Sequence, residues 1–367
     1  MDCARHDRER TGDIHAMAPL KSMTQTRTRL LTILSRFKDR RILVAGDLIV
    51  DEFLYGQIAR VSREAPVLVL EYGETRRLPG GAANAANNLL DLGCRVSFIS
   101  AIGPDESGRG LVAGLCGKGA DVRRVMELPS FATPVKTRIL AGAHHSSSPQ
   151  QVVRIDRVPA CRIESEKLWN SIHSRAPFHD GIILSDYGYG TVNPDLAASV
   201  AAAVKTLGKP VVVDSRFRMG EYSGVTSMTP NITELEAATS LSIGTDADLL
   251  RRAGRRVLSR QKLECLLVTQ GRFGMSLFKA RGPVVHIPIY GTDEVADVTG
   301  AGDTVIAVFT LALACGADPE DAARLANYAG GVVVMKRGTA TVTRAELEAA
   351  IEEDLSAARG RADRQRW

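Results

Sequence analysis

Short runs of apolar, largely β-branched residues alternate with stretches of helical periodicity along most of this chain. The runs end near Gly or Asp, and this rhythm is typical of a parallel sheet whose strands are joined by crossover helices. We therefore expect an α/β fold with a central, mostly parallel sheet. The strands are predicted at residues 41–47, 96–101, 181–185, 210–214 and 264–269. The helices are predicted near residues 82–92, 107–118, 163–175, 194–206 and 246–260, with a helical block over 301–354.

Two segments depart from this rhythm and predict a second, smaller sheet. Residues 55–72 and 131–156 alternate polar and apolar side chains, as strands with one solvated face do. Neither segment is followed at once by a helical pattern, so both suit a small β-layer that stands off the main sheet. The polar patch at 144–151 is interpreted as a loop tip.

The positive charge of the chain is concentrated at its two ends. The formal net charge is +5, whereas residues 1–40 carry +4, residues 359–367 carry +3 and the body between them carries −2. A basic surface for nucleic acid is therefore not expected on the body. We interpret residues 1–28 as a disordered extension, residues 29–358 as one folded domain and residues 359–367 as a basic tail.

Composition and cysteine spacing limit the class of protein further. With 44% hydrophobic and 24% charged residues, the chain is unlike disordered or collagenous sequences. Its six cysteines include no Cys-x-x-Cys pair and a single Cys-x-x-His, at Cys3 and His6, without a second pair to complete a site. This disfavours a zinc site and a disulfide framework and favours free thiols in the cytoplasm. The longest apolar run, residues 305–315, is too short to cross a bilayer, so no membrane partner is expected.

The strongest local signal for chemistry is the segment 297–304, Asp-Val-Thr-Gly-Ala-Gly-Asp-Thr, which comes immediately before that apolar run. Small residues at the start of a helix allow several backbone N–H groups to point at one place, and the helix N-terminus adds partial positive charge. The segment therefore suits a bound anion. Asp303 is either a helix-capping residue or a carboxylate placed beside that anion.

A second small-residue segment, 79–86, reads Pro-Gly-Gly-Ala-Ala-Asn-Ala-Ala and predicts the start of a helix. Its small side chains permit close helix packing, or close approach of a polar ligand to the backbone beside the Asn84 amide. It has neither the Lys nor the glycine spacing of a phosphate loop. Both interpretations of this segment stay open.

Five segments, taken in order, resemble those of the PfkB, or ribokinase-like, carbohydrate kinases, and the resemblance runs from about residue 41 to about residue 354. Residues 46–51 resemble the first-strand sugar site of that family, 80–86 its N-terminal signature, 229–234 its Asn-x-x-Glu segment, 269–274 its nucleotide loop and 297–304 its C-terminal signature. Five ordered motifs are hard to obtain by chance. The resemblance implies a ribokinase-like fold in which the small sheet is a lid over the sugar.

Within that family, the closest resemblance is to the kinase domains that phosphorylate D-glycero-D-manno-heptose 7-phosphate at the anomeric oxygen. It rests on residues 62–67, 150–156, 185–187 and 297–306. The chain has Arg63, Tyr189 and Arg216 where that subfamily has Pro, Lys and Lys. Arginine keeps the charge with another geometry, whereas Tyr189 removes a cation. Many relatives also carry a nucleotidyltransferase domain with a His-x-Gly-His loop, which this chain lacks, so only the kinase step is expected.

The resemblance implies a role for each motif. Asp303 would be the base that takes the proton of the sugar hydroxyl, while the amides of Gly300, Ala301 and Gly302 hold the moving phosphoryl group. The sugar would be bound by Asp47, Asp51, Gly80, Gly81, Asn84 and Asp186, together with Lys136, Arg138, Arg154 and Asp156 of the lid. ATP would be bound by Asn231, Glu234, Thr269, Gly271, Gly274 and Asn327, with Glu234 holding Mg²⁺ through water.

The lid and the partner follow from the same resemblance. A lid that closes over the sugar would exclude water and so limit hydrolysis of ATP. Lids in this family pair between subunits, which implies a homodimer. Two other functions stay open: a kinase for a different sugar or sugar phosphate, such as a pentose or hexose phosphate, and a sugar-binding regulator without catalytic activity.

Overall fold

The computed structural model describes residues 20–142, 149–291 and 297–364, and its centre is a five-stranded sheet. All neighbouring strands in this sheet are parallel, and Val44 in the central strand pairs with Phe98 on one side and Ile183 on the other. The strand order is β11 (Ser227–Met228), β10 (Val211–Ser215), β9 (Gly181–Asp186), β1 (Arg41–Gly46) and β4 (Arg95–Ile99). The predicted central parallel sheet is therefore confirmed.

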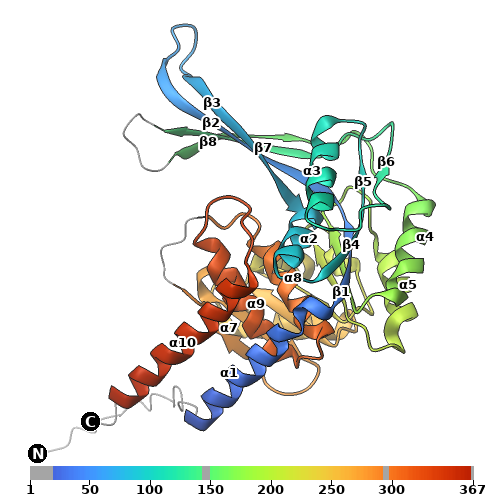
Figure 1. Cartoon of the computed structure of the whole chain (residues 1–367), viewed down its shortest axis with the longest axis vertical. Helices are drawn as coiled ribbons and strands as arrows, with labels where there is room; N and C mark the ends of the chain where they lie inside the picture. The colour runs from blue at the N-terminus through green and yellow to red at the C-terminus, as the bar shows by residue number, and fades with distance from the viewer. Residues whose placement is uncertain (1–19, 143–148, 292–296, 365–367) are drawn as a thin grey trace, which may run out of the picture.

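Helices cover both faces of this sheet and bury a separate core on each (Figure 1). Because side chains alternate along a strand, Ile42 and Val44 of β1 face one core while Leu43 and Ala45 face the other. The first core contains α1 (Leu20–Ser35), α2 (Ala82–Asp91), α3 (Glu106–Gly117), α8 (Ala301–Ala314), α9 (Pro319–Val334) and α10 (Arg344–Arg364). The second contains α4 (Glu166–Arg175), α5 (Pro194–Lys205), α6 (Ile232–Thr239) and α7 (Ala247–Arg260).

A four-stranded sheet projects from this body and forms the predicted small β-layer (Figure 1). Its strand order is β3 (Leu68–Gly81), β2 (Leu48–Val61), β7 (Val135–Gly142) and β8 (Gln150–Arg157). The strands extend further toward the body than the predicted 55–72, because β2 begins directly after β1 and β3 runs into α2. We call these four strands the lid. Most of the predicted loop tip at 144–151 lies outside the described residues.

The last predicted strand of the main sheet, 264–269, was assigned to the wrong sheet. In the structure β12 (Cys265–Thr269) pairs antiparallel with β13 (Met275–Lys279), which pairs with β14 (Val285–Ile287). A tight turn, and not a crossover helix, follows β12, so the next strand returns alongside it. The Thr269 N–H still donates to the carbonyl of Pro230 at 2.9 Å, which keeps this sheet against the main one. Two short strands, β5 (Ala101–Ile102) and β6 (Met126–Glu127), form a further pair.

The chain ends differ from the prediction of a disordered extension and a tail. Residues 1–19 lie outside the described part, but α1 begins at Leu20, inside the predicted extension, and buries Leu30 and Leu34 in the first core. Arg27 of α1 forms an ion pair with Glu352 of α10. Helix α10 continues to Arg364, past the predicted boundary at 358. Residues more than 300 positions apart therefore stabilise each other, which local patterns do not reveal.

Deletion of residues 1–28 is expected to lower the melting temperature by several degrees. It removes Arg27 and leaves only the last two turns of α1, too short a helix to be stable without its first half. Deletion of residues 1–19 is the matched control, because it leaves α1 and every described contact in place. Differential scanning calorimetry of both truncated proteins checks this, and equal melting temperatures for the two would contradict it.

No helix in the described ranges is long and apolar enough to cross a membrane. The five cysteines in those ranges are free thiols, and Cys94, Cys265 and Cys315 are buried. Burial raises the pKa of the Cys265 thiol to about 11.

Candidate active site

Asp303 is held at the start of α8 by donors from two other elements. It occupies the third position of the helix, after Gly300 in the left-handed conformation (φ 79°), and only 4% of its surface is exposed. The Asn84 Nδ2 donates to one carboxylate oxygen at 3.0 Å, and the Tyr187 hydroxyl donates to the other at 3.1 Å. The two hydrogen bonds therefore fix the orientation of the Asp303 carboxylate.

Burial raises the pKa of Asp303 from its usual range to about 7, the largest effect on this carboxyl. The hydrogen bonds from Asn84 and Tyr187 favour the ionised form and oppose the rise, as does the nearby Lys136 ammonium, whereas the Asp51 carboxylate adds to it. A carboxylate with a pKa near neutrality can accept a proton and release it again at physiological pH.

The N-terminus of α8 forms a cradle for an anion. Gly300 and Gly302 line the same cavity as Asp303, and the N–H groups of the first helical turn have no partner within the helix. The Ala301 N–H was expected to hold the phosphoryl group, but in the structure it donates to the carbonyl of Val298 at 3.3 Å. A side chain at Gly300 would overlap the Asn84 amide, so glycine is required there.

The cavity beside this cradle has a volume of about 330 Å³ and is rich in charge. Asn231 and Glu234 form a reciprocal capping box at the start of α6, with bonds of 2.9 and 3.0 Å. Arg216 donates to Glu234 at 3.2 Å, and Asp214 also faces the cavity. Burial raises the pKa of both Asp214 and Glu234, and the charge of Glu234 raises the pKa of Asp214 further. No group of three or more His, Cys, Asp or Glu side chains among the described residues is arranged to hold a metal directly.

A larger cleft of about 1150 Å³ continues from this cavity, since Asn231 and Thr269 line both. Gly271, which is predicted to contact the nucleotide, also lines the cleft. Two predicted nucleotide contacts are directed elsewhere. Gly274 closes the turn between β12 and β13, and the buried Asn327 amide donates to the carbonyl of Pro288 at 2.8 Å.

The lid brings charged side chains of β2 and β7 close to Asp303. Arg138 of β7 forms a 2.5 Å ion pair with Asp51 of β2, and both are largely buried. Lys136, two residues earlier on the same face, places its ammonium 4.8 Å from the centre of the Tyr187 ring. A side chain at Gly80 would overlap the Asp51 carboxylate, so the close approach of β3 to Asp51 requires glycine.

Arg154 and Asp156 of β8 bind each other. The guanidinium donates to both carboxylate oxygens at 2.7 Å, and both side chains are about 42% exposed. The pair lies on the same face of the lid as Lys136 and Arg138, because Lys136 is the cross-strand partner of Asp156 and Arg138 that of Arg154.

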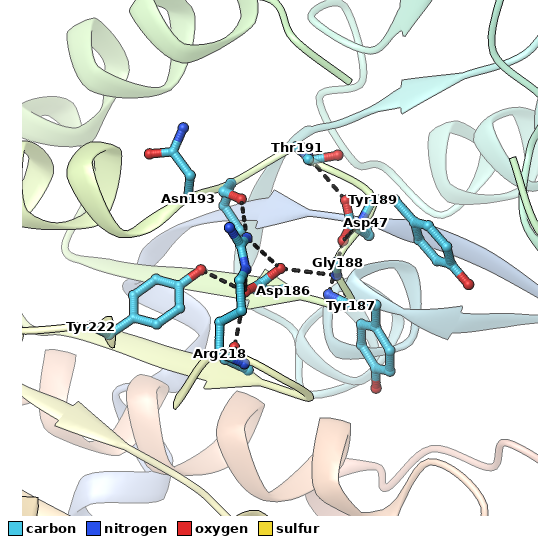
Figure 2. A network of polar contacts seen from close by, with 12 residues as sticks. Asp47, Asp186, Tyr187, Gly188, Tyr189, Thr191, Asn193, Arg218 and Tyr222 are labelled. Carbon is cyan, nitrogen blue, oxygen red and sulfur yellow. Dashed lines mark hydrogen bonds and ion pairs between the residues drawn. The ribbon is translucent and has the colours of Figure 1, made fainter. Parts of the chain in front are cut away.

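Two carboxylates predicted to bind sugar belong to the framework instead (Figure 2). Asp47 is 2% exposed and accepts the N–H groups of Tyr187, Tyr189 and Thr191 at 2.8 to 3.1 Å, which fixes the loop after β9. Asp186 is 1% exposed and bound by five donor contacts, so no oxygen of it is left for a ligand. These donors are Gly188 N–H, Ser215 Oγ, two nitrogens of Arg218 and Tyr222 Oη, at 2.7 to 3.2 Å.

Asn84 also has a different partner from the predicted sugar. It is fully buried, and its Nδ2 is shared between Asp303 and the carbonyl of Gly300 at 3.3 Å, while its Oδ1 accepts from Asn88. Gly81, at the start of α2, lies against the Tyr187 ring, because a side chain there would come within 3.1 Å of Cε2. Both residues therefore shape the surroundings of Asp303.

Sequence reasoning assigned no role to five residues that line the 330 Å³ cavity, and three of them carry ionisable side chains, namely Tyr187, Asp214 and Arg216. Asp214 and Tyr187 lie at the carboxyl ends of the neighbouring strands β10 and β9. In open α/β sheets ligands bind at that edge, so the position of these residues after buried strands is a signal that could have identified them. Arg216 was noted only as a replacement for lysine.

The fold is of the ribokinase-like class. A solved structure described as Arabidopsis thaliana ribokinase complexed with ribose and ATP superposes with a TM-score of 0.68 at 21% identity, covering 85% of this chain and 98% of that one. The model of the family described as pfkB family carbohydrate kinase matches residues 47–346. The chain belongs to the pfkB family of carbohydrate kinases.

Curated relatives are similar over most of this chain. The protein named Bifunctional protein HldE of Geobacter metallireducens is 44% identical over 325 residues, and that of Geobacter sulfurreducens is 45% identical over 309 residues. The alignments cover 88% and 83% of this chain but 65% and 61% of those relatives. The chain thus spans somewhat less than two thirds of their length.

Proposed function

We propose that this protein transfers the terminal phosphoryl group of ATP to the anomeric hydroxyl of D-glycero-β-D-manno-heptose 7-phosphate. The product would be the 1,7-bisphosphate used for ADP-heptose synthesis. The observation that carries the proposal is Asp303, a buried carboxylate with a pKa near 7 at the N-terminus of α8, in a cavity that continues into a nucleotide-sized cleft. The choice of heptose 7-phosphate as the substrate rests on the motifs that this chain shares with heptose 7-phosphate kinase domains.

The proposed mechanism assigns one step to each part of the cavity. Asp303 accepts the proton of the anomeric hydroxyl, whose oxygen forms the new bond to the γ-phosphorus while the bond to the bridging oxygen breaks and ADP leaves. The N-terminal amides of α8 stabilise the negative equatorial oxygens, and Arg216 adds positive charge from the facing wall. Catalysis is then mostly positioning and charge stabilisation.

The residues around Glu234 fit a hydrated Mg²⁺ ion. Asp214 and Glu234 are partly buried carboxylates in the phosphate cavity, and the charge of Glu234 opposes ionisation of Asp214. A divalent cation with its water shell would offset that repulsion. Glu234 would hold the ion through water, since the capping bonds keep its side chain at the start of α6. Bound there, Mg²⁺ neutralises charge on the phosphates.

The experiment that tests the substrate is ADP release measured with heptose 7-phosphate, heptose, ribose and hexose phosphates. The proposal is supported if, of these sugars, only heptose 7-phosphate causes release of ADP. Turnover with only another sugar phosphate would keep the kinase and replace the substrate. No ADP release with any of these sugars would favour a sugar-binding regulator.

A homodimer through the lid is part of the proposal. Strand β8 is an edge strand exposed along its whole length, and edge strands pair readily with another chain. Most of the exposed large apolar side chains among the described residues lie on the lid or in the chain directly next to its strands, and on a monomer they would face water. They are Ile58, Val61, Val67, Leu68, Tyr72, Val152, Val153, Ile155 and, just after β8, Val158.

Replacing Val153 and Ile155 together with Glu is expected to convert a dimer to a monomer. The two side chains are about half exposed on the lid face opposite Arg154, and two buried negative charges would prevent association. Leu207→Glu, at an equally exposed leucine after α5, is the matched control. Light scattering after size exclusion measures the mass, and an unchanged dimer in the double variant would exclude this interface.

A further inference from the structure

Tyr187 is the side chain through which the lid meets Asp303. Its hydroxyl donates to the Asp303 carboxylate at 3.1 Å, and the Lys136 ammonium of β7 stacks over its ring at 4.8 Å. Gly81 leaves the space that the ring occupies. No other tyrosine hydroxyl among the described residues donates a hydrogen bond to the Asp303 carboxylate.

Hydrogen bonds to two carboxylates also fix the backbone of Tyr187 and of the loop around it. Asp47 accepts the N–H groups of residues 187, 189 and 191, and Asp186 accepts that of Gly188, so the loop is fixed from both sides (Figure 2). Figure 2 shows the Tyr187 ring pointing away from the Asp186 and Arg218 side chains. A rigid loop that directs one phenol at one carboxylate is the arrangement needed to set the orientation of that carboxylate.

We infer that Tyr187 is a positioning residue, which orients the Asp303 carboxylate toward the sugar hydroxyl and couples it to the lid through Lys136. The inference rests on the proposed role of Asp303 as the base. A general base must present one lone pair to the proton it accepts, and the Tyr187 and Asn84 donors together fix the rotation of the carboxylate.

The charged groups around Asp303 determine the sign of the expected pH effect. Asp51 of β2 and Asp214 of β10 oppose its ionisation, whereas Lys136 of β7 and the Tyr187 hydroxyl favour it. Loss of the hydroxyl therefore raises the pKa of Asp303. Because the ionised form is the base, the acidic limb of the rate profile then moves to higher pH.

Tyr187→Phe removes the hydroxyl and keeps the ring. We expect kcat to fall about tenfold, as for loss of one hydrogen bond to a charged group, with the KM for the sugar little changed and the acidic limb of kcat/KM moved to higher pH. Tyr187→Leu removes the ring as well, so the KM for the sugar should also rise because Lys136 loses its stacking surface.

Tyr222→Phe is the matched control, since it removes a tyrosine hydrogen bond of 2.7 Å to a buried carboxylate of the framework, Asp186. It should lower the melting temperature and leave the acidic limb in place. If Tyr187→Phe behaves in the same way, Tyr187 is only structural and the inference is wrong. Incorporation of 3-fluorotyrosine at 187, a stronger donor, should move the limb to lower pH, which gives a second readout if Tyr187→Phe folds poorly.

The outcome for Asp303 separates this inference from the proposed function. If Asp303→Asn retains activity, the proposed base is wrong and the effect of Tyr187 has no basis. If Asp303→Asn is inactive while Tyr187→Phe keeps the wild-type kcat and pH profile, only the positioning role fails.

Discussion

Asp303→Asn is expected to lower kcat by about 10²- to 10⁴-fold, the usual cost of losing a general base. The amide has the shape of the carboxylate and can still accept from Asn84, while the Tyr187 hydroxyl can rotate to accept from the new amide N–H. Only the capacity to take a proton is lost. Steady-state ADP release, with ATP binding measured separately by calorimetry, checks the prediction.

The stability of the same variant provides the control for folding. The pKa of Asp303 is raised to about 7 in the folded protein, so its contribution to stability is fully present below its unfolded pKa and is lost as pH rises through 7. The neutral Asn does not incur the cost of the buried charge. The variant should therefore melt at or above the wild-type temperature at pH 8, with the difference shrinking toward pH 4. A variant that melts much lower at pH 8 would leave loss of activity explained by misfolding, and near wild-type turnover would remove Asp303 from the base role.

The elements that the sequence predicted well are those encoded by nearby residues. The strand at 181–186 is an uninterrupted buried run, and the start of α8 is marked by small residues before a long apolar stretch. Asn231 and Glu234 are three residues apart, the spacing of a capping box, and the structure places them together. Helix periods and caps act over one or two turns, so a local pattern is enough to locate them.

The roles of the buried carboxylates depend on partners that are distant in the sequence. Asp47, Asp51 and Asp186 each come directly after a run of apolar or small residues, so the local sequence does not distinguish them. Asp47 is satisfied by N–H groups 140 or more positions later, and Asp186 by an arginine 32 positions later, whereas Asp51 takes Arg138 of the lid. The topology of the fold, and not the local sequence pattern, therefore decides which carboxylate has its oxygens occupied by hydrogen bonds within the protein.

The assignment of β12 failed for a related reason. An apolar strand reads the same in a parallel and an antiparallel sheet, and only the next connection distinguishes them. Here the chain turns within five residues, at 270–274, so β13 pairs back on β12. The ion pair between Arg27 and Glu352 likewise joins the two ends of the chain, and no window of sequence contains both.

Heptose 7-phosphate is expected to be used about a hundredfold better than unphosphorylated heptose in kcat/KM. Each charge-assisted hydrogen bond to the distal phosphate contributes about 1.5 to 3 kcal/mol, so two such bonds are enough to give a hundredfold difference in kcat/KM. Lys136, Arg138 and Arg154 form the cationic face of the lid, but Arg138 is ion-paired with Asp51 and Arg154 with Asp156. Among the described residues, the Lys136 ammonium forms no ion pair or hydrogen bond and contacts only the Tyr187 ring, so it is the first candidate for the phosphate.

Lys136→Ala should therefore lower kcat/KM for the phosphosugar about tenfold more than for heptose, by loss of one such bond. The ratio between the two sugars isolates phosphate recognition, because any effect of Lys136 on Asp303 acts on both sugars alike. Arg157→Ala is the matched control, since Arg157 carries the same charge on the opposite face of β8 and should leave the ratio unchanged. Arg138→Ala is a poorer test, because it leaves Asp51 buried without its cation. Equal kcat/KM values for both sugars in the wild type, or an equal fall of both values in Lys136→Ala, would contradict recognition of the phosphate by the lid. Either result would favour a kinase for an unphosphorylated sugar.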